Sequence, residues 1–490
     1  MEKIRIPYLI AVSPIIFLTI LLSINVLLFE DTLGGPNQLA LLFSGALAAI
    51  IGIKYRSKWT EIIEGISNSI KSVAPAIIIL LLIGALAGTW LISGIVPAMI
   101  YYGLQILSPE IFLFATAIIT AIVSLVTGSS WSTIATIGIA LLGIGTALGL
   151  PLGLIGGAII SGAYFGDKMS PLSDTTNLAP SMSGTDLITH IRYMMYTTIP
   201  SFIITLIIFL VIGFFYTTEV SENQITDALN LISSKFSITP WLFLVPVAVI
   251  VMIIKKVAAV PSLFFGIILG AVFALIFQQD IVVEVSGKNT ANASSYYMGI
   301  MNSMTGDINF TEVNKGINNI FDVKEEDRSS LLKSGGMKGM INTIWLIVCA
   351  MIFGGALEVT GLLKRMAEPI IKYAQSTGSL IATTAGTCIF FNITTSDQYM
   401  SIVVPGRMFA DSYKEKGLAP ENLSRTLEDS GTVTSVLVPW NTCGAAQSAV
   451  LGVATLTYLP FCFFNLISPL MTIAYGYFGI KIKKLEKNIS

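Results

Sequence analysis

The sequence predicts an all-α membrane protein made of two inverted-topology repeats, each with a re-entrant hairpin and a discontinuous helix. Composition places the chain in a membrane, because 54% of its 490 residues are hydrophobic and only 12% are charged, whereas soluble domains carry roughly 25% charged residues. Between Ser72 and Gly166 the only formal charge is Glu110. A bilayer requires an uncharged stretch of this kind, and a water-soluble core does not.

Apolar segments long enough to cross roughly 30 Å of hydrocarbon recur along the chain. The first is too long for the core of a signal peptide, so it is expected to remain as a span. The clear spans are expected near residues 8–29, 38–53, 73–93, 194–217, 240–254, 261–278, 340–363 and 460–480.

Two regions, 109–188 and 378–458, are apolar on average but are interrupted by Gly, Ser, Thr, Asp, Asn and Pro. Irregular backbone at membrane depth is tolerated only where protein or a watery cavity surrounds it. These regions are therefore where a transporter would keep its site. Each is predicted to be a re-entrant hairpin, 109–148 or 378–411, followed by one discontinuous crossing helix.

The two halves of the chain correspond at a fixed offset. The spans that start at Val73 and Met340 are 267 positions apart, and Ser130 and Asp397 differ by the same offset. So do the pairs Asp174-Thr175 and Asn441-Thr442. Inverted repeats whose broken helices meet at the midplane are a recurrent transporter architecture.

Lysine and arginine placement predicts the orientation of the spans. Basic residues at the N-terminus (Lys3, Arg5) and in the C-terminal tail indicate that both termini are cytoplasmic. The predicted organisation is a first repeat at 1–217, an external linker at 218–238, a second repeat at 239–480 with a polar external insertion at 279–338, and a basic cytoplasmic tail at 481–490.

The densest polar cluster, residues 166–177, directly follows an apolar run. Pro171 removes a backbone donor and so frees carbonyl groups of the preceding turn. One carboxylate with several neutral oxygens is what a monovalent cation needs in place of its water. Asp174 is the first candidate for the carboxylate that exchanges a proton for a cation. The supporting oxygens on the break and on the facing hairpin tip are predicted to come from Ser173, Thr175, Asn177, Ser129 and Ser130.

The second half supplies a carboxylate on the hairpin, Asp397, and an amide on the helix break, Asn441, followed by Thr442. A sodium ion is predicted at Asp174, Thr175, Ser130 and Asn441. An ionised Asp at the centre of a spanning helix costs about 2.5–3.5 kcal/mol, so such a group is expected to hold a proton or a cation. After Asp174, the candidates for exchange are Asp167 and Asp397, followed by Glu428 and Asp429.

Several of these residues have simpler interpretations. Asp167 beside Lys168 can be a local ion pair at a helix end, and Glu428 with Asp429 can lie at the cytoplasmic entrance. His190, the single histidine, titrates in the range of a pH sensor but is expected at a membrane surface. The four cysteines lack metal-ligand or redox spacing and are interpreted as packing residues.

The motifs at 128–138 and 157–180, continued at 184–190, resemble the signature of the NhaC family of sodium/proton antiporters. They read Gly-Ser-Ser-Trp-Ser-Thr-Ile-Ala-Thr-Ile-Gly and Gly-Ala-Ile-Ile-Ser-Gly-Ala-Tyr-Phe-Gly-Asp-Lys-Met-Ser-Pro-Leu-Ser-Asp-Thr-Thr-Asn-Leu-Ala-Pro. The resemblance implies inverted repeats with re-entrant hairpins and sodium efflux driven by proton entry across the bacterial inner membrane. Related members exchange organic acids, including malate against lactate.

Exchange of Na⁺ for H⁺ is the leading hypothesis, with no cofactor, a lipid bilayer environment and a possible homodimer. Coupled exchange of a small carboxylate is the alternative. A carboxylate cargo requires a cationic partner or helix N-termini, and Lys168 and Arg407 are the obvious basic candidates near the breaks. The net charge of −1 argues against a nucleic-acid partner, and one histidine cannot supply the zinc ligands of a H-E-x-x-H protease.

Overall fold

The computed structural model describes residues 6–29, 34–106, 108–215, 221–255, 257–321, 332–371 and 373–485. Within these ranges eight helical runs are long and apolar enough to cross a membrane, so the chain is a multi-pass integral membrane protein. They are α1 (Tyr8–Leu28), α2 (Pro36–Lys54), α4 (Ala74–Ile92), α6 (Pro109–Thr127), the run Ser130–Ala147, α11 (Leu187–Phe215), α14 (Ala259–Phe277), and α18 with α19 (Gly336–Gly339 and Ile341–Val359).

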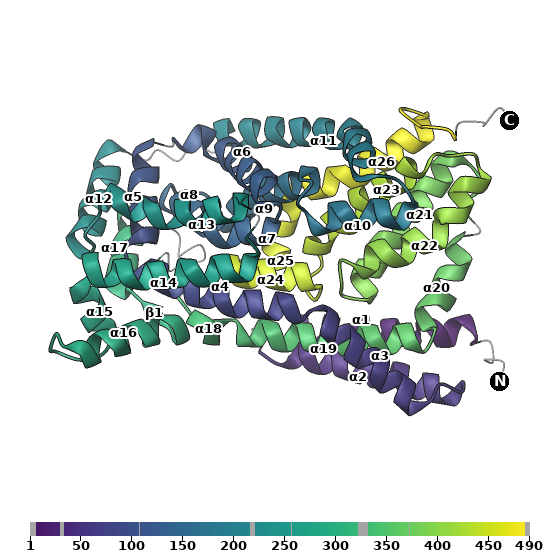
Figure 1. Cartoon of the computed structure of the whole chain (residues 1–490), viewed down its shortest axis with the longest axis horizontal. Coiled ribbons are helices and arrows are strands. Elements are labelled where there is room, and N and C mark those ends of the chain that lie inside the picture. Colours follow the sequence, from purple (N-terminus) through teal and green to yellow (C-terminus); the bar gives the residue numbers. More distant parts are fainter. Residues whose placement is uncertain are drawn as a thin grey trace.

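The long helices lie roughly along the longest axis of the molecule, as Figure 1 shows for α4, α11 and α19. The beginning of α1 and the described end of the chain lie at the same end of this axis. The prediction that both termini are cytoplasmic requires this arrangement, although which face is cytoplasmic stays a prediction. Lys3, Arg5 and the tail residues 486–490 lie outside the described residues.

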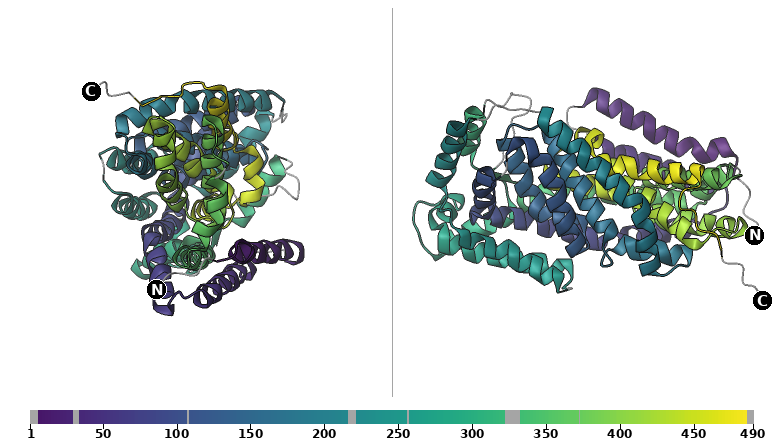
Figure 2. Two further views of the ribbon diagram at one scale, coloured as in Figure 1. Left: turned by 90° about the vertical axis from the view of Figure 1, so that its right-hand side faces the viewer. Right: turned by 90° about the horizontal axis from the view of Figure 1, so that it is seen from above.

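Helix α1 lies at the edge of the bundle in both views of Figure 2. Several of its apolar side chains are largely exposed, including Leu9 at 80% and Leu27 at 83%. An apolar helix face that no protein covers is the surface expected against lipid.

The polar segment 279–338 is largely helical and lies at the opposite end of the long axis (Figure 1). It contains α15 (Gln279–Val285), α16 (Ala293–Thr305), α17 (Thr311–Ile320) and a two-stranded sheet of β1 (Ile308–Asn309) and β2 (Lys333–Ser334). Its contact with α4 is close, since a Cβ added at Gly88 would lie 1.7 Å from the Ser303 carbonyl oxygen. The segment therefore packs on a spanning helix, while residues 322–331 lie outside the described chain.

Helix boundaries repeat along the chain at the predicted offset. Helices α19 and α20 (Leu362–Ile371) each begin 267 residues after α4 and α5 (Ile95–Ile106). Helices α5 and α20 lie at opposite ends of the long axis in Figure 1. Inverted repeats would place them in this way, and the symmetry itself stays a prediction.

Each region predicted to form a hairpin consists of two helices joined by a short turn, and the re-entrant path itself stays a prediction. Helix α6 turns at Gly128 into a run made of α7 (Ser130–Thr133), a π-helical turn and α8 (Ile139–Ala147). Helix α21 (Thr377–Thr394) turns at residues 395–399 into α22 (Met400–Glu415).

Each hairpin is followed by a broken helix. In the first half, α9 (Leu152–Met169) stops before residues 170–173, and α10 (Asp174–Ser183) follows. In the second half, α23 (Pro420–Leu427) continues through a π-helical stretch, Glu428–Thr432, and a 3₁₀ turn before the break at 438–441. Helix α24 (Thr442–Leu451) follows.

Small residues allow the first hairpin to pack tightly on its broken helix. A Cβ added at Gly162 of α9 would lie 2.1 Å from the Ala117 carbonyl oxygen of α6, and Ser124 donates a hydrogen bond of 2.6 Å to the Ala163 carbonyl. Close helix approach through small residues is characteristic of membrane bundles.

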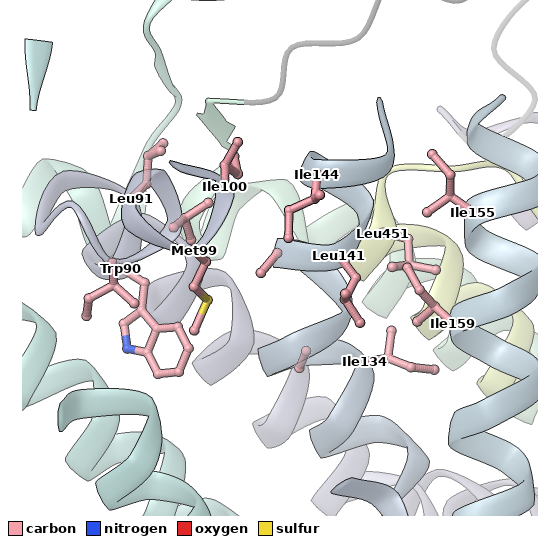
Figure 3. Packing of buried hydrophobic residues seen from close by; sticks show 14 of the residues in the cluster. Trp90, Leu91, Met99, Ile100, Ile134, Leu141, Ile144, Ile155, Ile159 and Leu451 are labelled. Atoms are coloured by element: carbon pink, nitrogen blue, oxygen red, sulfur yellow. The ribbon is translucent and has the colours of Figure 1, made fainter. Parts of the chain in front are cut away.

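Figure 3 shows the apolar packing around this hairpin, where Leu451 of α24 lies close to Leu141 and Ile159 of the first half. Elements from both halves therefore share one buried apolar cluster.

Candidate functional site

A cavity of about 260 Å³ lies where the two hairpin tips and the two helix breaks meet. Both halves contribute to its wall, and the bend between α3 (Trp59–Ser72) and α4 completes it. The predicted meeting of residues 166–177 with residues 395–442 is therefore present. The lining residues are Ser72, Val73, Pro75, Ala76, Ile79, Gly128, Ser129, Trp131, Asp167, Ser173, Asp174, Thr175, Asp397, Gln398, Tyr399, Thr442 and Cys443.

Five helices begin at this cavity. The run starting at Ser130 and helices α4, α10, α22 and α24 each place residues of their first turn or N-cap in the wall. A helix N-terminus carries unsatisfied N–H groups and about half a positive charge. The three carboxylates of the cavity lie at the ends of the Ser130 run, α10 and α22, and Asn441 caps α24.

Asp167 joins the first broken helix to the first hairpin tip. Its Oδ2 atom accepts hydrogen bonds from the Ser130 N–H at 3.1 Å and from the Ser130 hydroxyl at 2.7 Å. The side chain is 8% exposed, so it is almost enclosed and yet borders the cavity. A carboxylate at the N-terminus of a helix that belongs to another element binds the two elements together.

Asp397 has a different role at the second hairpin tip. Its Oδ1 atom accepts hydrogen bonds from the N–H groups of Tyr399 at 2.6 Å and Met400 at 3.1 Å, which belong to its own turn. The contact between the second tip and the second break is made by backbone, since the Thr442 N–H donates to the Ser396 carbonyl at 2.9 Å.

Asp174, the first candidate from the sequence, opens α10 and lines the cavity with an exposed side chain. Ser173 caps this helix, because its hydroxyl accepts from the Thr176 N–H and lies 3.2 Å from the Thr175 hydroxyl. On the facing hairpin tip, Ser129 caps the run that begins at Ser130. These oxygens surround the same cavity.

Three predicted ligands, Ser130, Asn177 and Asn441, do not line the cavity. Ser130 lies between the wall residues Ser129 and Trp131 in the sequence and is bonded to Asp167. The Asn441 amide donates to the backbone and side-chain oxygens of Asn392, both at 3.1 Å, and so holds the second break against α21. Asn177 is exposed and donates to the carbonyls of Pro171 at 3.0 Å and Ser173 at 2.7 Å. Both amides therefore hold the backbone around the cavity.

A buried ion pair lies behind the cavity. Lys168, the neighbour of Asp167, pairs with Asp429 of the second half, and both side chains are 0% exposed. Lys168 also donates to Ser468 at 3.1 Å, and Thr197 donates to the other Asp429 oxygen at 2.8 Å. The alternative of a local Asp167–Lys168 pair at a helix end is therefore wrong, because the partner of Lys168 lies 261 residues away.

Glu428 and His190 are also buried, which corrects two simpler interpretations. Glu428 has no exposed surface and does not lie at an open entrance. His190 is not at a surface, because α23 packs over the first turns of α11 and His190 Nδ1 lies 2.8 Å from the Ser424 hydroxyl. Local hydropathy could not reveal this long-range cover.

A second cavity, of about 460 Å³, runs between α3, α19 and the second hairpin tip. It shares Ser72 and Asp397 with the central cavity, so these residues stand between the two spaces. Glu358 and Asn68 are also among its lining residues.

Sequence reasoning missed part of the cavity wall. Gln398 and Tyr399 follow Asp397 directly, and Trp131 and Cys443 follow predicted ligands. The sequence signal that could have identified these four residues is their position directly beside the predicted tips and breaks. The α3–α4 bend carried a weaker signal, the proline at 75 inside an apolar run.

Comparison with known proteins adds a family. A model described as the Na⁺/H⁺ antiporter family matches residues 162–480. The chain is 37% identical to the Na⁺/H⁺ antiporter NhaC of Alkalihalophilus pseudofirmus, covering 89% of each chain. It is 38% identical to the malate-2H⁺/Na⁺-lactate antiporter of Bacillus subtilis, covering 98% of this chain and 96% of that one. Among solved structures, the Alcanivorax borkumensis YdaH transporter is similar at a TM-score of 0.38 and 11% identity, covering 97% and 99%.

Proposed function

Because the chain belongs to the Na⁺/H⁺ antiporter family, we propose that it exchanges cytoplasmic Na⁺ for external H⁺ by alternating access, with Asp167 as the carboxylate that both ions share. The observation that carries this proposal is the position of Asp167, buried at the cavity and bonded to the tip of the opposing hairpin.

Charge balance in the cavity favours a cation as cargo. Five helix N-termini and the C-terminal ends of α3, α6 and α9 border the cavity, so the helix ends bring only about one positive charge in total, against three negative charges if every carboxylate is ionised. The described lining residues include no Lys or Arg. A site with net negative charge attracts a monovalent cation and repels a free carboxylate.

The same geometry suggests how two ions compete at Asp167. Ser130 engages Oδ2, and the Ser173 hydroxyl also lies close to the carboxylate, so a proton or a cation at Asp167 would bind beside Ser173. The hydroxyls of Ser173 and Thr175 and the backbone of the tips supply neutral oxygens around a cation. A proton and Na⁺ both neutralise the carboxylate, and occupancy by one disfavours the other. Release of a proton on one side and of Na⁺ on the other therefore couples the two fluxes.

Asp167 also links ion binding to movement. The hairpin tip and the broken helix are separate elements that meet through the Asp167–Ser130 contact. Neutralising the carboxylate weakens this charge-assisted bond, which allows the two elements to separate and the site to face the other side. Asp174 adds negative charge at the exposed side of the cavity, where it attracts the entering cation.

Exchange of small carboxylates is the second candidate, and the similarity to the Bacillus subtilis malate-2H⁺/Na⁺-lactate antiporter favours it. Neither of the two basic residues expected near the breaks is placed to bind a carboxylate cargo, because Lys168 is paired with Asp429 and Arg407 is exposed on α22. A carboxylate cargo would therefore have to enter with Na⁺ or protons already bound.

Purified protein in liposomes that carry a pH-sensitive dye distinguishes the two candidates. The liposomes are acidified inside and then given sodium, potassium, malate or lactate outside, with choline chloride and protein-free liposomes as controls. Na⁺/H⁺ exchange predicts dye recovery with sodium chloride alone. Recovery that requires malate or lactate would overturn the proposal in favour of carboxylate exchange.

A further inference from the structure

The described end of the chain, residues 481–485, forms a strap across the start of the second broken helix (Figure 1). The strap follows α26 (Phe463–Phe478) and pairs antiparallel with the turn between α22 and α23. The Ala419 N–H donates to the Lys483 carbonyl at 3.0 Å, and the Leu485 N–H donates to the Gly417 carbonyl at 2.9 Å. The strap is therefore bonded to this turn on both sides of one residue pair.

The strap also joins the two halves of the molecule, through Tyr193 of α11. The Tyr193 hydroxyl bonds Asn422 Oδ1 of α23 at 2.6 Å and also bonds the Lys481 carbonyl. The Asn422 amide donates to the Lys483 carbonyl at 2.6 Å. Any movement that separates α23 from α11 breaks bonds of this set, so the docked strap restrains such a movement.

Docking of the strap leaves polar atoms of two α23 side chains unpaired. Glu421 pairs with Lys483 of the strap through Oε1, whereas its Oε2 atom has no hydrogen-bond partner among the described residues. Arg425 is 0% exposed, and its Nη1 donates to the Lys481 carbonyl at 3.3 Å. In the same part of the chain its Nε and Nη2 atoms have no partner. These two nitrogens form an edge of the guanidinium that binds a carboxylate with two parallel bonds.

Glu421 and Arg425 lie on the same helix at the i, i+4 spacing that allows a side-chain ion pair. Such a pair would satisfy the Oε2 atom of one residue and the free edge of the other. The docked strap also has a cost of its own, because Lys481 has φ +48°, in the left-handed region that ordinary residues avoid. The groups of α23 therefore have an alternative arrangement that does not need the strap.

We propose that the strap is a brake on ion exchange. In the docked state Glu421 pairs with Lys483 and α23 is held on α11; in the released state Glu421 pairs with Arg425 and the second broken helix is free to move. The inference rests on the proposed function, because exchange by alternating access requires elements of the two halves to separate. Since α23 continues through the π-helical stretch to the break at 438–441, release of its first turn affects the cavity.

A disulfide between the strap and the turn tests this proposal. Leu418 and Lys484 form an antiparallel pair flanked by the two backbone hydrogen bonds; such a pair has Cα atoms about 4.5 Å apart, a separation that a disulfide spans. Liposomes with Leu418→Cys/Lys484→Cys protein and a pH-sensitive dye are assayed with sodium before oxidation, after it and after reduction. The rate of Na⁺-dependent dye recovery should fall in proportion to the crosslinked fraction and return on reduction. Each single variant, treated in the same way, is the control, because the four native cysteines are buried.

Removal of the strap's ion pair gives a second, opposite readout. Lys483→Met weakens the docked state alone, so exchange should become about two- to fivefold faster, the factor expected for a partly exposed ion pair. Lys484→Met changes an exposed lysine of the strap outside this pair and is the matched control.

Each outcome decides the question. An unchanged rate in the fully crosslinked protein overturns the proposal and leaves the proposed function in place. Exchange by Lys483→Met that is no faster than exchange by Lys484→Met also overturns it, since the pair would then not hold a brake. If the unmodified protein and the reduced double variant show no Na⁺-dependent recovery, the proposed function fails and the brake fails with it.

Discussion

The two halves of the molecule build the same junction of hairpin tip and helix break, but they place their carboxylates differently. In the first half, Asp167 on the broken helix reaches the tip and binds Ser130 of another element. In the second half, Asp397 sits on the tip and caps its own helix. The hydrogen bonds of Asp167 therefore depend on contact between two separate elements. Those of Asp397 stay within one turn and stabilise the start of one helix.

The uncharged break of the second half strengthens this contrast. Where the first break has Asp174, the second has Asn441, whose amide is used entirely in local contacts with Asn392 and the Cys443 N–H. A break without a carboxylate cannot exchange ions by itself. The two halves are therefore chemically unequal: the carboxylates on the break lie in the first half, and the second half contributes the buried acids Asp397, Glu428 and Asp429.

Replacing the two cavity carboxylates separately tests the contrast most strongly. Asp167→Asn should lower Na⁺-dependent dye recovery by about 100-fold, because hydrogen bonds to a charged group are worth about 1.5–3 kcal/mol and Asn cannot exchange a proton. Asp397→Asn should lower it by only about two- to fivefold, since Asn caps helices as well as Asp does and the lost charge at a helix end is worth about 0.3–1 kcal/mol.

Initial rates in the liposome assay measure both variants at equal amounts of incorporated protein. Equal losses in the two variants would remove the distinction between a bridging and a capping carboxylate. Near-normal exchange by Asp167→Asn would show that another acid, with Asp174 first, holds the ions.

The ion pair across the two halves predicts the largest effect on stability. Lys168→Met or Asp429→Asn alone should cost about 3–5 kcal/mol, because each leaves a buried charge without its partner. The double variant should recover much of this loss. Lys235→Met, which breaks the exposed pair with Glu284, is the matched control and should cost about 0–1 kcal/mol.

Unfolding in detergent, followed by intrinsic fluorescence, gives these stabilities. Additive losses in the double variant would mean that Lys168 and Asp429 do not stabilise each other, and the two halves would then lack this electrostatic link.

Much of the fold could be predicted from sequence because its determinants are local. Hydropathy locates the spans, and Gly128 and Pro171 mark a tip and a break at positions that the structure keeps. The residues around the cavity were also accessible, since they cluster at these interruptions. The burial of each carboxylate could not be predicted from the sequence. Asp167 and Asp174 lie on opposite sides of one break, and the packing of the helices alone decides which side chain is enclosed.

Long-range pairing explains the remaining differences. The partner of Lys168 is Asp429, and the cover over His190 comes from α23. Neither partner is visible in the local pattern, since both depend on how the second broken helix docks against α9 and α11. Reasoning from one half at a time cannot supply these contacts.

The first hairpin tip depends on a glycine that packs closely. Gly128 has φ +69°, and a Cβ there would lie 2.5 Å from Leu172 Cβ on the helix break. Gly128→Ala should lose about 1–2 kcal/mol to the left-handed backbone and about 1–3 kcal/mol more to overpacking. Gly184→Ala is the control, because φ is +84° with nothing within 4 Å. Equal losses of stability for the two variants in thermal unfolding would show that the tip and the break are not tightly packed against each other.

The second tip turns without a glycine, and this predicts the smallest effect. Ser396 has φ +61°, is buried, and has a hydroxyl without a partner among the described residues. Ser396→Gly should therefore stabilise the protein by up to about 1 kcal/mol, as the left-handed cost of about 1–2 kcal/mol exceeds the added flexibility of Gly. Arg56→Gly relieves a similar backbone, φ +73°, in an exposed turn after α2 and serves as control. If backbone strain at the tip assists movement of the tip, Ser396→Gly should slow exchange and Arg56→Gly should not. Equal exchange rates in the two variants would show that the strain at Ser396 has no role in transport.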